Sequence, residues 1–367
     1  MEMKNQLHYL PDELIIQILL RLPVKSLVHF KCVCKSWFSI ISDTYFTNSH
    51  FQLTAATHTH RALLISTVKP HVTRSIDLEA SLDDDSAASV SLKPPYYSLP
   101  CNAIKGSCRG FILFLHGYRS FFLWNPSTGL HKKIPLSPYN LDHMYPNYYG
   151  FGYDQSTDDY LIVSMSSNLS SSYYEFFSLR ANIWKQIDEG THIHYSTCNM
   201  KGDYRTQGSL FNGAIHWFAH RLDLEKNVIF AFDLTERKLL DMNLPDEFGA
   251  KLHYGGLWVF QEFLSLSGGN YYNGTVEIWV MKEYKQHSSW TKTHVLPTDA
   301  IPYRYFCPLT STKSGDIVGT DLLPGFVKYN DEGQLVWHHS YSILRDEYLV
   351  TMYIESLLSL PGDNVQA

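Results

Sequence analysis

The sequence lacks the features that mark membrane, secreted and nucleic-acid-binding proteins. It contains no run of about 18 apolar residues, the length that a membrane-spanning helix needs. Its first residues do not follow the basic, apolar and small-residue order of a signal peptide. The 30 Lys and Arg residues are outnumbered by 36 Asp and Glu residues, so the formal net charge of -6 offers no basic field to nucleic acid. We therefore expect no membrane partner and no nucleic-acid partner.

Cysteine pairs and metal-site patterns are also missing. The 6 Cys residues are scattered without a C-x-x-C pair, and we interpret them as reduced thiols of a protein of the cytoplasm or nucleus. The histidine pairs His192/His194 and His338/His339 have no third ligand at metal-site spacing. No phosphate-binding loop, dinucleotide fingerprint or zincin motif occurs. The sequence therefore predicts neither a metal ion nor a cofactor.

One stretch has the spacing of a catalytic motif. The order Gly106-Ser107-Cys108-Arg109-Gly110 matches the G-x-C-x-G of a nucleophile elbow. An elbow needs a strand before it and a helix after it, whereas here a proline-containing loop precedes and an apolar strand pattern follows. His216 lies among apolar and aromatic residues in another strand pattern, which is typical of a structural histidine. We predict no catalytic residue.

Aromatic side chains, in contrast, are abundant. The chain has 25 Tyr and 20 Phe residues, and its aromatic content of 14% favours β-strands. A length of 367 residues exceeds that of one average domain. The composition therefore predicts either two domains or one small module followed by a large β domain.

Helical spacing marks the beginning of the chain. Leu14, Ile18 and Leu22 recur at i, i+4 and i+8. Pro11 suits the first turn of a helix, and Pro23 would break one. The pattern predicts a helix that is apolar over most of its circumference. Such a helix either caps the following domain or keeps a second face for a partner.

Further short helices are predicted directly after this one. One spans about 24–31 and another about 34–42. Asp43 is expected to cap a short fourth turn that runs through Phe46. Together these segments form a helical module.

The residues from Leu10 to about Phe51 resemble the F-box, in the form common among plant F-box proteins. The matching pattern is L-P-D-E-L-x-x-x-I-L-x-R-L-P-V-K-S-L-x-x-F-K-C-V-C-K-S-W. The resemblance implies that the module binds a Skp-type adaptor, which links it to a cullin and RING ubiquitin ligase. The residues at the motif positions, which form the candidate adaptor-binding site, are Leu10, Pro11, Leu14, Ile18, Leu19, Leu22, Pro23, Leu27, Cys32, Val33, Cys34, Lys35 and Trp37. Some of them are expected to face the adaptor and others to pack the helices together.

The next stretch changes from helical to strand patterns. Residues 62–66 and 74–78 are predicted to be the first strands. The small, acidic and polar residues of the segment 79–95 predict a mobile loop. The predicted division of the chain is an F-box module over 1–53, first strands over 54–100 and a β domain over 100–360.

From about residue 100 the sequence is a series of short strands separated by turn residues. Aromatic anchors recur at roughly 50-residue spacing, which suits a four-stranded propeller blade of the kelch size. These anchors are Trp124, Phe177, Phe232, Trp279 and Tyr329. They mark about five units. Residues 60–100 offer a sixth, and residues 348–353 offer a strand that closes the ring.

The predicted fold class is therefore a small α-helical F-box followed by an all-β domain, a kelch-like β-propeller. The glycine pairs Gly255-Gly256 and Gly268-Gly269 do not repeat in each unit, and no Trp-Asp repeat exists. An irregular β-sandwich remains the alternative fold.

A second resemblance covers roughly residues 100–340. The stretches 106–110, 124–128, 150–154 and 213–217 resemble, in order, motifs of the F-box-associated domain of plant proteins. This resemblance implies a domain that recruits a substrate protein for ubiquitination. The chain is thus expected to be a non-catalytic substrate-recognition subunit of an SCF-type ubiquitin ligase. The alternative is a carbohydrate-binding or hydrolase propeller with a helical cap.

An aromatic segment over 139–149 is the candidate cargo-binding loop. Tyrosines in loops supply rigid contact area for protein partners. Tyr145, Tyr148 and Tyr149 are the residues proposed for this role. The alternative is that these rings pack over the edge of a blade.

Overall fold

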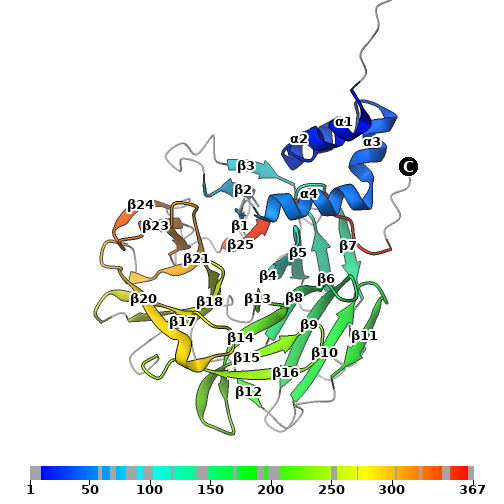
Figure 1. The fold of residues 1–367 in the computed structure, drawn as a ribbon. Coiled ribbons are helices and arrows are strands. Elements are labelled where there is room, and N and C mark those ends of the chain that lie inside the picture. The colour runs from blue at the N-terminus through cyan, green and yellow to red at the C-terminus, as the bar shows by residue number, and fades with distance from the viewer. Residues whose placement is uncertain are drawn as a thin grey trace, which may run out of the picture.

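The computed structural model places four α-helices beside a ring of β-sheets (Figure 1). The helices come first in the chain, and strands β1 to β25 follow. The residues that the structure describes are 10–56, 60–66, 72–79, 89–93, 102–116, 120–135, 137–138, 148–167, 172–187, 194–196, 207–248, 254–270, 272–301, 304–321, 325–340 and 348–362.

Three of the four helices begin directly after a residue that the sequence marked, namely Pro11, Pro23 and Asp43. The helices are α1 (Asp12–Leu19), α2 (Val24–Phe30), α3 (Lys35–Ser42) and α4 (Thr44–Ala56). Pro11 and Pro23 occupy the N-cap positions of α1 and α2, where the absence of a proline N–H costs no intrahelical bond. Asp43 caps α4 as predicted, because its Oδ1 accepts a 2.9 Å hydrogen bond from the Phe46 N–H. The fourth helix is far longer than the single turn that we expected.

Six antiparallel sheets form the β domain, and we call them blades 1 to 6. Blade 1 contains β25 (Tyr348–Ile354), β1 (His60–Ser66), β2 (Thr73–Asp77) and β3 (Ser89–Leu92). Blade 2 contains β4 (Asn102–Cys108), β5 (Phe111–His116), β6 (Ser120–Trp124) and β7 (His131–Ile134). Blade 3 contains β8 (Tyr148–Asp154), β9 (Asp159–Ser167), β10 (Ser172–Ser178) and β11 (Ile183–Gln186).

The other three blades follow in chain order. Blade 4 contains β12 (Tyr195–Ser196), β13 (Ser209–Phe211), β14 (Ala214–Arg221), β15 (Lys226–Asp233) and β16 (Leu239–Asn243). Blade 5 contains β17 (Tyr254–Phe260), β18 (Phe263–Asn270), β19 (Thr275–Met281) and β20 (Trp290–Pro297), with the 3₁₀ helix η2 (His287–Ser289) before β20. Blade 6 contains β21 (Cys307–Ser311), β22 (Ile317–Thr320), β23 (Gly325–Tyr329) and β24 (Leu335–Ser340).

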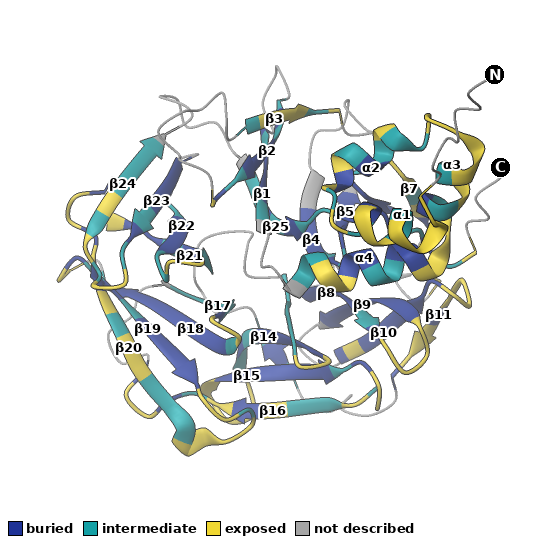
Figure 2. Cartoon of the chain, turned by 45° about the horizontal axis from the view of Figure 1, so that its top comes forward, coloured by how far each residue is buried: buried dark blue, intermediate teal, exposed yellow. Residues whose placement is uncertain are grey.

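The blades form a ring because each pair of neighbours shares one apolar cluster. Separate clusters join blades 1 and 2, 2 and 3, 3 and 4, 4 and 5, 5 and 6, and 6 and 1. Middle strands such as β6 are therefore covered on both faces, which explains their continuous apolar sequence. The outer strands β7 and β11 are largely exposed (Figure 2). The chain therefore has the propeller architecture that the 50-residue spacing predicts.

The ring is closed by its first and last strands. Strand β25 pairs with β1 in an antiparallel ladder that runs from His60↔Ile354 to Ser66↔Tyr348. The predicted closing strand over 348–353 is therefore confirmed, and so is the sixth unit near residues 60–100. The acidic loop expected over 79–95 is wrong in its last part, because Ser89–Leu92 forms β3 and pairs with β2. Residues 80–88, the core of that expected loop, lie outside the described residues.

Candidate functional site

The helical module has a small apolar core of its own. Leu19, Leu27 and Ile41 are almost fully buried in it. The Trp37 ring packs beside this core, and its centroid lies 5.3 Å from that of Phe30. Since these residues already satisfy the packing of the module, apolar side chains on its outer surface have no role in that packing.

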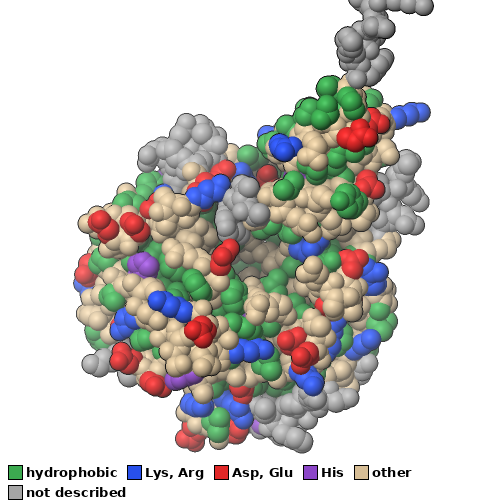
Figure 3. Space-filling view, in the orientation of Figure 1, with side chains coloured by type: hydrophobic (Ala, Val, Ile, Leu, Met, Phe, Trp, Pro, Cys, Tyr) green, Lys and Arg blue, Asp and Glu red, His purple; other side chains and the backbone are tan. Residues whose placement is uncertain are grey.

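Such outer side chains form a row along α1. Leu14 and Ile18 are one turn apart and lie on one face of α1, and Leu10 comes just before the N-cap of that helix. Leu10, Leu14 and Ile18 are 56%, 51% and 52% exposed, and Val33 between α2 and α3 is 59% exposed. Figure 2 shows α1 as largely exposed, and Figure 3 shows hydrophobic atoms gathered on the outer end of the module. Isolated exposed apolar residues are common, but a row of this kind marks an interaction surface.

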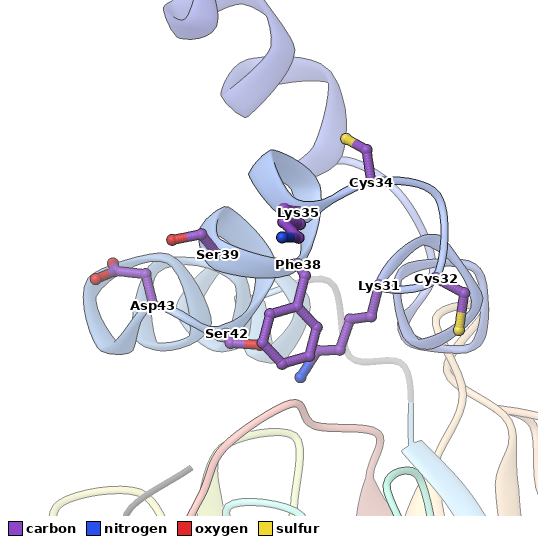
Figure 4. Close-up of a pocket in the computed structure, with 8 residues that line it drawn as sticks. All are labelled: Lys31, Cys32, Cys34, Lys35, Phe38, Ser39, Ser42 and Asp43. Carbon is purple, nitrogen blue, oxygen red and sulfur yellow. The ribbon is translucent and has the colours of Figure 1, made fainter. Parts of the chain in front are cut away.

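A pocket of about 900 Å³ lies between the α2–α3 connection and α3. Its lining residues are Lys31, Cys32, Cys34, Lys35, Phe38, Ser39, Ser42 and Asp43. In Figure 4 the side chains of Lys31, Phe38 and Ser42 lie close together, whereas the Cys34 thiol points away from them. Burial lowers the pKa of the Lys31 ammonium group.

The start of α3 shapes one edge of this pocket. The Cys34 sulfur accepts a 3.5 Å hydrogen bond from the Trp37 N–H and so caps α3. Lys35, Phe38 and Ser42 are spaced at i, i+3 and i+7, which places them on the same face of that helix. This helical spacing was the signal by which the sequence could have identified Phe38 and Ser42 as surface residues beside the motif.

Comparison with known proteins assigns both parts of the chain. Residues 7–49 match the F-box domain model, and residues 56–317 match the model of the F-box associated beta propeller domain. The chain belongs to the F-box protein family. Both expected resemblances are thereby confirmed, and the helical module is the F-box.

Similar proteins in Arabidopsis thaliana carry the same assignment. The F-box/kelch-repeat protein At3g23880 is 30% identical over 308 residues, which cover 79% of this chain and 80% of the relative. The F-box protein CPR1 is 28% identical over 335 residues, which cover 83% of this chain and 77% of the relative. A solved structure described as the Dos1 propeller covers 75% of this chain and 67% of its own, with 8% identity and a TM-score of 0.40.

The structure divides the F-box motif residues into two groups. Leu19 and Leu27 are buried in the module, and Leu22 and Trp37 are partly buried against it. The remaining motif residues are exposed, and they are Leu10, Pro11, Leu14, Ile18, Pro23, Cys32, Val33, Cys34 and Lys35. The row that the sequence identified through Leu14 and Ile18 is therefore the outward face of α1. Ile16 and Leu20, two other apolar residues of this segment, pack against the F-box core.

The candidate cargo-binding loop is wrong for two of its three residues. Tyr148 and Tyr149 belong to β8, and both rings are buried. The Tyr148 hydroxyl donates a 2.8 Å hydrogen bond to the Ser196 carbonyl oxygen, and its ring meets that of Phe230 edge to face. Strand β8 begins at Tyr148, within the segment that we predicted to be a loop. Tyr148 packs in the cluster between blades 3 and 4, and Tyr149 packs in the cluster between blades 2 and 3. Tyr145 lies outside the described residues.

The two candidate catalytic side chains have structural surroundings. Cys108 is buried at the end of β4, and burial raises the pKa of its thiol to about 12, although Arg109 opposes the shift. A thiol with this pKa stays protonated at neutral pH and is a poor nucleophile. His216 is fully buried and contacts the Ser209 carbonyl oxygen and the Tyr284 hydroxyl.

Metal-binding groups and membrane-spanning helices were sought in the part of the chain that the structure describes. No cluster of three or more His, Cys, Asp or Glu side chains in that part is arranged to hold a metal ion. His338 instead contacts Asp321, with 2.8 Å between Nε2 and Oδ2. Among the same residues, no helix has both the length and the apolar character required to cross a membrane.

Proposed function

We propose that this F-box protein is the substrate-recognition subunit of an SCF-type ubiquitin ligase. In this proposal the exposed row of Leu10, Leu14 and Ile18, together with Val33, binds a Skp-type adaptor. The adaptor connects the chain to a cullin and RING ligase, and the propeller recruits an unknown protein for ubiquitination. The chain itself contributes proximity and orientation, and its partners perform the chemistry. We expect this assembly in the cytoplasm or nucleus.

The exposed row carries the proposal because it has the properties of an interface centre. A few large apolar side chains usually supply most of the free energy of a protein interface. Beside Val33 in the chain, Cys32, Cys34 and Lys35 are also exposed and give this surface a more polar margin. The F-box core lies behind the row, so the row is presented by helices that are already packed.

We further propose a cargo-binding face of the propeller from the position of the F-box. In Figures 1 and 2 the helices lie over one end of blades 2 and 3. Residues of α4 contact Arg109 in the β4–β5 turn, at this end of blade 2. The opposite ends of these strands point away from the F-box, and we propose that cargo binds on that side of the ring.

The adaptor proposal is tested by an Ile18→Asp substitution in the full chain. A buried, unpaired carboxylate at the centre of the interface is expected to weaken the complex with a Skp-type adaptor at least 100-fold. The thermal midpoint of the free chain should change little, because Ile18 is exposed. Val336→Asp in β24 is the matched control, since both side chains are 52% exposed. Equal adaptor affinity for the wild type and Ile18→Asp would contradict the proposal.

A further inference from the structure

The F-box and the propeller meet through a half-buried arginine, Arg109. Arg109, in the turn between β4 and β5, places its guanidinium carbon 4.9 Å from the ring centroid of Phe51 in α4 and 4.0 Å from that of Tyr153 in β8. It also donates a 2.7 Å hydrogen bond to the Asn48 side-chain oxygen. One propeller side chain thus contacts two residues of α4, and cation–π contacts of this kind strengthen when water is excluded.

A segment at the other end of the chain contacts both parts. We call residues 355–360 the C-terminal strap, and it follows β25 directly. Leu357 is buried in the F-box core. Leu358 and Leu360 are buried instead in the cluster between blades 2 and 3, which also contains Phe51. Neighbouring residues of the strap therefore insert into two different cores.

Blade 2 holds this strap by hydrogen bonds. The fully buried Asn125 side-chain amide donates to the carbonyl oxygens of Ser356 and Leu358, at 3.0 and 3.4 Å. The Ser356 N–H donates to the Ser127 hydroxyl oxygen at 3.2 Å. Asn125 and Ser127 lie in the turn after β6, so the motif over 124–128 includes residues that bind the strap.

The geometry of the β4–β5 turn shows why Arg109 and Gly110 occupy it. Arg109 has a φ of 49° and Gly110 has a φ of 86°. The corresponding turn of blade 4 has Asn212 and Gly213, the pair that such tight hairpin turns favour. Arginine has no preference for a positive φ, so the turn itself does not favour Arg109. Its side chain instead reaches α4. A Cβ atom on Gly110 would lie 2.2 Å from the Ser356 Cβ, so the strap packs directly on the glycine.

We propose that Arg109, Gly110 and the C-terminal strap form a latch that locks the F-box onto blades 2 and 3. The F-box and the propeller then move as one body. Because the strap continues from β25, closing the ring also brings the strap to the F-box. The latch itself is independent of any partner; its consequence, a fixed distance between adaptor and cargo, rests on the proposed function.

The decisive comparison is Gly110→Ala with Gly213→Ala in the full chain. Both substitutions put a Cβ on a glycine with a left-handed φ, 86° and 72° respectively, and so impose similar strain. Only the first meets the strap, since a Cβ on Gly213 has no neighbour within 4 Å. Hydrogen exchange of α4 and of residues 355–360 should accelerate at least 10-fold in Gly110→Ala and stay near wild type in Gly213→Ala. Equal exchange in the two variants would overturn the proposal.

A milder variant keeps the proposal testable if Gly110→Ala fails to fold. Arg109→Asn suits the left-handed turn but removes the contacts with Phe51, Tyr153 and Asn48. It should loosen α4 while leaving the amides of β5 and β6 protected. Gln261→Asn is the control, because Gln261 has a φ of 46° in the equivalent turn of blade 5. Unchanged exchange of α4 in Arg109→Asn would reject the latch.

Adaptor affinity separates this proposal from the proposed function. The exposed row on α1 is untouched by these substitutions, so the latch variants should bind a Skp-type adaptor within threefold of wild type. Failure of the wild type and of every latch variant to bind the adaptor would reject the proposed function and leave the exchange result valid. Normal binding with wild-type exchange would reject the latch alone.

Discussion

Leu63 in β1 and Thr351 in β25 are direct register partners, although they come from opposite ends of the propeller sequence. Their strands complete blade 1, and the strap that follows β25 continues into the F-box core. The last strand of the chain thus contributes to two structures at once. Neither contact can form before the whole propeller has been synthesised.

Substitution of Tyr353 should reveal the strength of this closure. Its hydroxyl is 2.7 Å from that of Ser75 in β2, and its ring is buried between blades 1 and 2. Tyr353→Ala should lower the free energy of unfolding by about 3–5 kcal/mol, and Tyr353→Phe by about 1 kcal/mol. Urea unfolding measures both. Tyr272→Ala, at a ring that is 86% exposed, should change stability by less than about 0.5 kcal/mol.

The burial of Tyr148 predicts a stability role in place of cargo binding. Tyr148→Ala removes a buried ring and its hydrogen bond to Ser196, so it should cost about 3–5 kcal/mol of unfolding free energy. Tyr173→Ala, in the same blade, removes a ring that is 46% exposed and should cost much less. Thermal or urea unfolding compares the two variants. Similar stabilities for Tyr148→Ala and the wild type would show that the ring is not part of the core.

His216 should make the propeller less stable as the pH falls below about 6.5. Burial lowers its pKa to about 4, although its hydrogen bonds to the backbone favour a higher pKa. Between these two values the unfolded chain binds a proton that the folded chain does not, so stability falls as the pH is lowered from 6.5 to 4. Over this pH range the free energy of unfolding falls by about 3 kcal/mol at most.

An His216→Asn variant isolates this contribution. Its amide can still donate to the Ser209 carbonyl oxygen, but it does not titrate. Urea unfolding between pH 7 and pH 4 should show a flatter pH dependence for the variant than for the wild type. Parallel curves for the two proteins would mean that His216 takes up its proton at the same pH in the folded chain as in the unfolded chain.

Asp154 should make the stability of the fold depend on pH in a more acidic range than His216 does. Burial raises its pKa, but hydrogen bonds from Thr157, Ser156 and Arg237 outweigh that effect and lower it to about 2. Because the folded pKa lies below the ordinary value of 3.8, the stabilisation is complete above that pH and disappears as the pH falls to 2. The charged Asp154 carboxylate contributes about 2 kcal/mol to the free energy of unfolding at neutral pH.

Asp154→Asn tests this directly. The variant should be less stable than the wild type at pH 7, and the difference should shrink towards pH 2. Arg237, which donates a 2.8 Å hydrogen bond to the Asp154 carboxylate, would lose its charged partner in the variant. A stability difference that stays constant from pH 7 to pH 2 would show that the carboxylate charge is unimportant.

Local features were predictable where the signal lies within a few residues. Pro11, Pro23 and Asp43 mark helix starts through steric and hydrogen-bonding preferences that need no tertiary context. Tyr148 could not be placed in this way, because an aromatic residue suits both an exposed loop and a buried strand. Only the neighbouring blade, with the Phe230 ring, decides between these environments.

The sequence by itself determined that this chain is an F-box module followed by a β domain built from units of about 50 residues, because motif and periodicity are carried by neighbouring positions. Tertiary structure alone decided which motif residues face outward, since Leu19 and Ile18 are adjacent and similarly apolar, yet Leu19 is buried and Ile18 is exposed. It also decided the contact between Gly110 and Ser356, because packing between distant segments leaves no periodic signal in either one.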